Sequence, residues 1–173
     1  MQTTTLIPTR SHARLAVRVL GALLLLFVGA DHYYEYSVDQ YSVLPTIGTL
    51  FLLNFISATA VGLLLLAPLG RLFHRFGGAA LQIAAASGFG IAVTSLVALL
   101  VSEQTKLFGF MESNYRPAIL VAIASEAAAA LALGLLLVLT LRAKQSVSTP
   151  RRGPSTTTRS RHLNPVRIPR HTP

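Results

Sequence analysis

The sequence contains no cysteine and no tryptophan, and aspartate and glutamate together number only 6. The lack of cysteine excludes disulfides, thiolate metal sites and a cysteine nucleophile. Without tryptophan, an aromatic belt at a membrane interface must consist of tyrosine, with help from phenylalanine. Charged residues make up 12% of the chain, whereas an average soluble domain has about 25%. Together with a hydrophobic content of 52%, this indicates a membrane protein.

Four apolar segments are long enough to cross a bilayer, which takes about 20 residues. They cover residues 15–34, 46–67, 78–101 and 118–141. Pro45 and Pro117 precede the second and fourth segments, where proline suits the start of a helix. We therefore expect an all-α fold, a four-helix transmembrane bundle preceded by a loose lead-in over residues 1–14.

The basic residues are concentrated on one side of the predicted bundle. Of the 15 lysines and arginines, all but Lys106 and Arg116 lie at the start of the first segment, between the second and third, or after the fourth. The positive-inside rule places such residues in the cytoplasm. We therefore expect a multi-pass protein of the plasma membrane with both termini cytoplasmic.

A second interpretation of the first segment stays open. Residues 19–30 follow several arginines and end in Val28-Gly29-Ala30, which resembles the core and cleavage site of a signal peptide. Cleavage would leave three spans and a C-terminus that is still cytoplasmic. Tyr33 and Tyr34, however, suit a membrane interface better than a new N-terminus.

Residues at the membrane boundary fall into two classes. At the outer boundary we expect the acids to lie in water and these aromatic side chains to lie at headgroup depth: Tyr33, Tyr34, Tyr36, Phe108, Phe110 and Tyr115. At the cytoplasmic boundary we expect these basic side chains to contact lipid headgroups: Arg71, Arg75, Arg142, Lys144, Arg151 and Arg152.

The last part of the chain, residues 142–173, is rich in arginine, serine, threonine and proline. It cannot bury enough apolar surface to fold, so we expect a disordered basic cytoplasmic tail lying against anionic lipids of the inner leaflet. No aromatic residue lies between its arginines to stack on bases, and nucleic acid is not expected as a partner.

Glu126 is the least expected residue, because it lies well inside the fourth span. A carboxylate there costs at least ~2.5 kcal/mol on insertion scales, and it normally faces the bundle interior. Glu126 and Asn54 follow Pro117 and Pro45, respectively, by the same number of residues, so we expect them at one depth. The sequence predicts one polar layer in the outer half of the bundle, built from Asp31, His32, Asn54, Thr94, Ser95 and Glu126.

The third span carries two columns of small residues at i+4 spacing. One column is Ala80, Ala84, Gly88 and Ala92, and the other is Ala86, Gly90, Thr94 and Ala98. Small residues let helices approach closely in lipid. We therefore expect this span to be central and to pack on both faces, or to form a homo-oligomer or contact another membrane protein through them.

Several motifs resemble those of a known group of proteins. They are G-A-D-H-Y-Y-E-Y, P-T-I-G-T-L-F-L-L-N, L-F-G-F-M-E-S and S-E-A-A-A-A. In these motifs residues 15–141 resemble small uncharacterised four-span bacterial integral membrane proteins, and in architecture alone they are loosely similar to DoxX-like proteins. The recurring residues of the group map to His32, to the run from Pro45 to Asn54, and to Glu126. The resemblance implies a four-span fold and topology but no activity, since none is assigned to the group.

Three function classes follow from these residues. The favoured one is a non-enzymatic bundle of unknown biochemical activity, without metal or cofactor, whose polar layer holds the spans together. The alternative is a carrier or sensor for a proton, ion or small molecule, with Glu126 as the titrating group and His32 as its proton partner. The third, a membrane enzyme or a metal site built from Asp31, His32 and Glu126, lacks a diagnostic ligand spacing, a P-loop, a dinucleotide fingerprint and a nucleophile–base signature.

Overall fold

A computed structural model of the protein describes residues 9–106, 111 and 117–148. In this part of the chain every regular element is helical: α1 (Thr9–Ser37), η1 (Tyr41–Val43), α2 (Pro45–Leu66), α3 (Leu69–Leu72), η2 (His74–Phe76), α4 (Gly77–Ser102) and α5 (Pro117–Ser148). The segments long and apolar enough to cross a membrane are His12–Ser37, Pro45–Leu66, His74–Ser102 and Pro117–Ala143. The prediction of an all-α fold is therefore confirmed for the described residues, with four helices long and apolar enough to cross a membrane.

Two helices extend further than the sequence analysis predicted. α1 begins at Thr9, inside the predicted lead-in, and α5 continues to Ser148, inside the stretch predicted to be disordered. Hydropathy marks where an apolar run ends, but a helix continues through good helix formers such as the alanine, lysine and glutamine that follow Arg142. The rest of the predicted tail, residues 149–173 with Arg151 and Arg152, lies outside the described residues.

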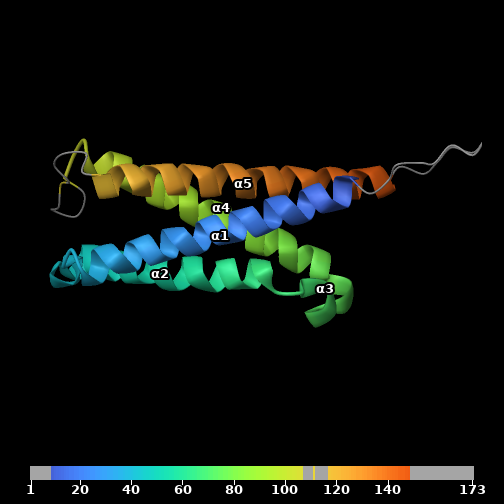
Figure 1. Ribbon diagram of the computed structural model, residues 1–173, viewed down its shortest axis with the longest axis horizontal. Helices are drawn as coiled ribbons and strands as arrows, with labels where there is room; N and C mark the ends of the chain where they lie inside the picture. The colour runs from blue at the N-terminus through green and yellow to red at the C-terminus, as the bar shows by residue number, and fades with distance from the viewer. Residues whose placement is uncertain (1–8, 107–110, 112–116, 149–173) are drawn as a thin grey trace, which may run out of the picture.

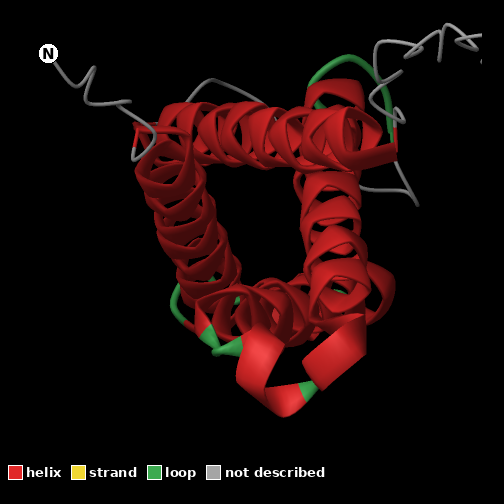
Figure 2. Ribbon diagram, turned by 90° about the vertical axis from the view of Figure 1, so that its right-hand side faces the viewer, coloured by secondary structure: helices red, strands yellow, loops and turns green. Residues whose placement is uncertain are grey.

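The four long helices form a ring in the order α1, α2, α4, α5. α1 packs against α2 and α5, and α4 packs against the same two helices. The end-on view in Figure 2 shows the long helices arranged around the bundle axis. Each helix runs antiparallel to its two neighbours (Figure 1). The start of α1, the short helix α3 and the end of α5 share one end of the bundle, here called the terminal end. η1 lies at the opposite end, here called the loop end.

The half of the bundle nearer the terminal end is tightly packed. Its core consists of Ala22, Leu25, Ala58, Leu65, Ala84, Ala85, Leu133 and Leu136, and the next layer toward the loop end consists of Val28, Ala92, Ala129 and Ala130. At Gly62, an added Cβ would lie 2.8 Å from the Leu26 side chain and 3.2 Å from the carbonyl oxygen of Ala22. Small residues thus bring α1 and α2 close together, as expected for helices packing in lipid.

An arginine closes the end of α2. The guanidinium of Arg18 donates a hydrogen bond to the carbonyl oxygen of Leu65 at 2.5 Å and another to that of Ala67. The last carbonyls of a helix have no partner within the helix and carry partial negative charge. Arg18 therefore satisfies these carbonyls and fixes the start of α1 against the end of α2.

α1 runs unbroken through Val28-Gly29-Ala30, the motif that resembles a cleavage site. Val28 is fully buried, and a Cβ on Gly29 would lie 2.9 Å from the hydroxyl oxygen of Thr59 on α2. Cleavage at this motif would remove a helix that packs against two others and contributes to the bundle core.

Candidate functional site

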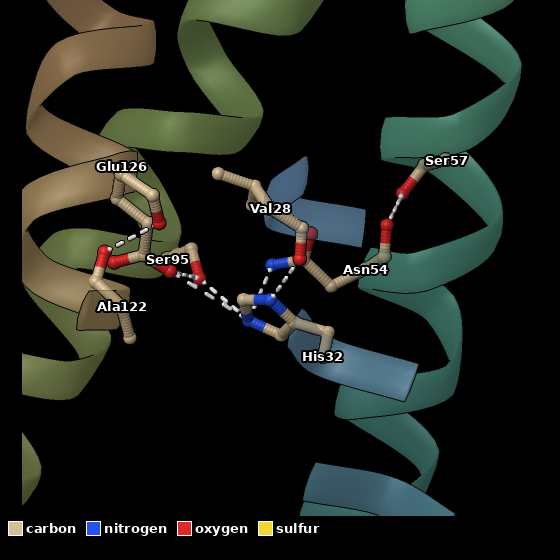
Figure 3. Close-up of polar contacts among 8 residues, drawn as sticks. Val28, His32, Asn54, Ser57, Ser95, Ala122 and Glu126 are labelled. Atoms are coloured by element: carbon tan, nitrogen blue, oxygen red, sulfur yellow. Dashed lines mark hydrogen bonds and ion pairs between the residues drawn. The ribbon is translucent and has the colours of Figure 1, made fainter. Parts of the chain in front are cut away.

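Around the imidazole of His32 on α1 lie three polar side chains, one from each of the other long helices (Figure 3). The Nε2 atom of His32 on α1 lies 2.9 Å from the hydroxyl oxygen of Ser95 on α4 and 3.1 Å from the amide nitrogen of Asn54 on α2. It lies 3.7 Å from Oε1 of Glu126 on α5. The Ser95 hydroxyl in turn lies 2.5 Å from that same carboxyl oxygen. We call His32, Asn54, Ser95 and Glu126 the polar cluster.

The ring of His32 is held in place from two sides. Its Nδ1 atom lies 2.9 Å from the carbonyl oxygen of Val28, one turn earlier in α1. The Phe51 ring lies against the imidazole, with 5.2 Å between the ring centroids, and Phe51 stacks in turn on Tyr41. The orientation of Nε2 toward the bundle axis is therefore set by the backbone and by neighbouring rings.

The cluster is buried but not fully satisfied. Glu126 is only 1% exposed and His32 only 8%. Oxygen Oε2 of Glu126 and oxygen Oδ1 of Asn54 are buried without a hydrogen-bond partner in the described part of the chain. Such groups are uncommon in folded proteins and call for a specific explanation. An unsatisfied carboxyl oxygen in a membrane span is costly and is typical of a functional position.

The hydrogen bonds of the cluster restrict where its protons lie. A carbonyl oxygen only accepts, so Nδ1 of His32 carries a proton that it donates to Val28. The Ser95 hydroxyl has a single proton but two neighbours, Nε2 of His32 and Oε1 of Glu126. It can donate to one of them only, and it must accept a hydrogen bond from the other.

Two arrangements satisfy this condition. In the first, Glu126 is a carboxylic acid that donates to Ser95, and Ser95 donates to a neutral His32. In the second, His32 is an imidazolium that donates to Ser95, and Ser95 donates to the Glu126 carboxylate, so the Asn54 amide nitrogen, itself a donor, no longer has an acceptor at Nε2. The transfer of two protons, one into and one out of the Ser95 hydroxyl, converts one arrangement into the other. Glu126, Ser95 and His32 therefore have the geometry that a short proton relay requires.

A cavity of about 820 Å³ extends from the polar cluster toward the loop end. Ligand pockets in proteins typically have about 300–1,000 Å³, so it has room for a small molecule. All four cluster residues line it, and so do Asp31 and Thr94, the other two members of the predicted polar layer. Asp31 and Thr94 stand on the cavity wall and take no part in the hydrogen bonds that join the cluster.

One predicted packing face turned out to be a cavity wall. On α4 the column with Ala84, Gly88 and Ala92 is buried, as expected for a packing face. In the second column Ala86, Gly90 and Thr94 are exposed, and Gly90 and Thr94 line the cavity. α4 therefore packs against α2 and α5 as expected, but within the bundle only one of its two small faces is buried, and an oligomer contact through the other stays a prediction. A small residue allows a neighbouring helix to pack closely, but where no helix does so it leaves empty volume beside the backbone.

The sequence did not predict the burial of Glu35. This acid was expected in water, yet it is only 7% exposed and lines the cavity. Its spacing from His32 is i, i+3, which puts both on one face of α1, and this spacing could have revealed it. Tyr41 and Phe51, which hold the imidazole, carried no comparable signal in the sequence.

The predicted boundary residues lie largely at the surface. Tyr33 and Tyr34 are about half exposed and Tyr36 is partly buried, while Phe108, Phe110 and Tyr115 lie outside the described residues. Arg71, Arg75 and Arg142 are exposed. Lys144 lies in α5, but its side chain is not among those described.

The three residues considered as metal ligands do not form such a set. In residues 9–106, 111 and 117–148 there is no group of three or more histidine, aspartate or glutamate side chains that could hold a metal ion. The Nδ1 atom of His32 is occupied by Val28, and its Nε2 atom faces Ser95 and Asn54. In this geometry both ring nitrogens of His32 take part in hydrogen bonds.

No protein-family model, no curated protein and no solved structure matches this chain. The resemblance to small four-span bacterial membrane proteins, and the looser one to DoxX-like proteins, stays a prediction from the motifs quoted above. The residues of the polar cluster and the cavity are the basis for assigning a function.

Proposed function

We propose that this chain is a multi-pass membrane protein that binds a small molecule in the cavity and links binding to a proton shared by Glu126, Ser95 and His32. The observation that carries this proposal is the buried Glu126, with its unpaired Oε2, at one end of a cavity of about 820 Å³. A polar layer that only fastens helices is expected to satisfy its own hydrogen bonds and to leave little empty volume. The geometry therefore favours a carrier or sensor over a purely structural bundle.

Through this relay, ligand binding in the cavity would change which of Glu126 and His32 carries the shared proton. A ligand that donates a hydrogen bond to Glu126 stabilises the carboxylate, and the second arrangement, with the proton on His32, is then favoured. A ligand that only accepts competes with Ser95 for the single proton of the carboxylic acid. Asp31, Glu35 and Tyr41 are further titratable side chains among the described residues that line the cavity, and a negative charge on either carboxyl group would affect the balance.

We infer that the terminal end faces the cytoplasm of a plasma-membrane protein and that the cavity lies in the outer half of the bilayer. The support is the distribution of exposed basic residues, since Arg71 and Arg75 lie in and next to α3 and Arg142 lies near the end of α5. These arginines are placed to contact anionic lipids of the inner leaflet. The guanidinium of Arg75 lies over the Phe76 ring, 4.8 Å from its centroid, which is a cation–π contact.

The proposal is tested by infrared titration of the protein in liposomes. A protonated carboxyl group has its own carbonyl band, and we expect one such band to come and go reversibly with pH in the parent protein. The band should be missing in Glu126→Gln. Glu103→Gln is the control, since Glu103 lies just beyond the end of α4 and is not part of the cavity lining.

If no band assignable to Glu126 titrates while the protein stays folded, the carboxyl group is a fixed fastener and the proposed function fails. If the band titrates in the parent and in Glu103→Gln but not in Glu126→Gln, Glu126 exchanges its proton with the surroundings, as a proton-linked site requires.

A further inference from the structure

The cavity has one buried wall and one open wall. The α1 and α5 side is formed by buried residues such as His32, Glu35, Ile119 and Glu126. The α2 and α4 side contains exposed residues, including Leu50 and Leu53 on α2 and Val97 and Val101 on α4. The cavity therefore opens sideways between α2 and α4.

This opening faces the lipid. Leu50, Leu53, Val97 and Val101 lie within the membrane-crossing segments Pro45–Leu66 and His74–Ser102. Among the cavity-lining residues, neither α2 nor α4 contributes a charged side chain. A hydrated ion or a sugar would have to cross hydrocarbon to reach such an opening, at high cost. A molecule already dissolved in the bilayer would reach it directly.

The two ends of the cavity differ in chemistry. At the end formed by the polar cluster, Glu126 Oε2 and Asn54 Oδ1 are two buried oxygens without partners in the described residues, so each of them lacks a hydrogen-bond donor. Away from the cluster the lining is largely apolar, with Phe51, Ile91 and Leu99 among its residues. A ligand that fits both ends has an apolar body and one polar group that donates a hydrogen bond.

We propose that the cavity binds an uncharged, membrane-soluble amphiphile carrying a hydroxyl group, which enters from the lipid between α2 and α4 and donates its hydrogen bond to Glu126 or Asn54. The proposal rests on the proposed function and names its ligand class and entry route. The same chemistry occurs in a bilayer lipid with a hydroxyl head and in a free lipophilic alcohol.

The probe is a long-chain fatty alcohol with a diazirine in its chain, added to the protein in nanodiscs and activated by light. We expect labelled peptides to come from the facing surfaces of α2 and α4 around the opening. An unlabelled fatty alcohol should compete, and the alkane of equal length should compete about tenfold less well, the factor expected from one lost hydrogen bond. This comparison needs no change to the protein.

A matched pair of glycine variants tests the entry route. Gly90 and Gly78 both lie on α4, and a Cβ at either would meet no atom within 4 Å, but only Gly90 lines the cavity. Gly90→Phe should block the opening and reduce labelling about tenfold or more, while Gly78→Phe should leave labelling unchanged. Circular dichroism and thermal melting of both variants show that each is folded.

Two further readouts separate the remaining outcomes. Native mass spectrometry of protein released from its membrane shows a lipid adduct if the ligand is a bilayer lipid, and saturable labelling without that adduct assigns the site to a free alcohol. Labelling spread evenly over the outer faces of all four long helices would overturn the proposal. So would a stable dimer that Gly90→Phe dissociates, since a second copy would then cover the opening. In either case a titrating Glu126 infrared band would leave the proposed function standing.

Discussion

The Nε2 atom of His32 and the hydroxyl oxygen of Ser95 lie 2.9 Å apart, although they come from α1 and α4, the diagonally opposite helices of the ring. Such a contact brings both side chains to the bundle axis, where Asn54 and Glu126 from the other diagonal pair join them. One serine thus connects a histidine and a carboxyl group that are 3.7 Å apart. This places Ser95 at the centre of the proposed relay.

Replacing Ser95 by alanine is expected to uncouple Glu126 from His32. Hydrogen bonds between membrane helices average roughly 0.6 kcal/mol, with a maximum near 1.7, so the loss of stability should be small. The pH midpoint of the Glu126 infrared band, by contrast, should move clearly. Ser87→Ala is the control, because Ser87 is an exposed serine on the same helix. An unchanged midpoint in Ser95→Ala would remove Ser95 from the relay.

Replacing Arg18 by glutamine is expected to destabilise the bundle. The substitution removes charge-assisted hydrogen bonds to the carbonyls of Leu65 and Ala67 at the end of α2, and hydrogen bonds to charged groups contribute about 1.5–3 kcal/mol. Thermal melting in detergent measures the effect. Arg71→Gln is the matched control, since Arg71 is an exposed arginine near the same end of the bundle. Equal melting temperatures for the two variants would show that Arg18 contributes nothing beyond its charge.

Two glycine-to-alanine substitutions are expected to act in opposite directions. At Gly48 an added Cβ would lie 2.6 Å from the carbonyl oxygen of Tyr41 and 3.0 Å from the Cα atom of Ser42. Because both are backbone atoms, Gly48→Ala should cost about 1–3 kcal/mol. Gly90→Ala meets open space and should be neutral or gain up to about 1 kcal/mol of helix propensity. Thermal melting of both variants checks this, and a tolerated Gly48→Ala would contradict the tight packing of η1 on α2.

Because the chain has no cysteine, a single introduced cysteine can report on which side of the membrane each end of the bundle lies. Gln40→Cys lies at the loop end just before η1, and Gly70→Cys lies on α3 at the terminal end, and both positions are exposed. In intact cells, a maleimide that cannot cross the membrane should modify Gln40→Cys at once. It should modify Gly70→Cys only after permeabilisation. The reverse pattern would place the terminal end, and with it the proposed cytoplasmic side, outside the cell.

The sequence predicts the transmembrane architecture well because hydropathy and proline positions define the apolar cores of the spans. The predicted start of 46 for the second span and the observed start at Pro45 differ by one residue. The ends of α1 and α5 were predicted less well, since a helix leaving the hydrocarbon no longer needs apolar residues. Hydropathy describes depth in the membrane but not what surrounds each face of a helix.

The sequence predicted the level along the bundle at which the site residues lie, but not how their helices are ordered around the ring. Asn54 and Glu126 follow their prolines at equal distance, which predicted a common level, and the structure places both beside His32 and Ser95. The order of helices around the ring, which brings the histidine toward the carboxyl group, depends on side-chain packing between helices and leaves no periodic signal. The cavity was missed for the same reason, because Gly90 and Thr94 have the small side chains that are also typical of a closely packed face.

The packed core on one side of the polar cluster and the cavity on the other make the site accessible from one side only. Between the polar cluster and the terminal end, the bundle is filled by Leu25, Leu65, Leu133 and Leu136. The cavity is therefore closed on this side and does not continue through the bundle. A molecule that arrives from the lipid must leave by the way it came unless the inner halves of the helices separate. Room for such a guest would be gained by separating α2 and α4 at the loop end, while the packed half at the terminal end stays closed. Ligand binding would then first change the conformation of η1 and the start of α2. This conformation is therefore better suited to sensing a ligand than to transporting it across the membrane.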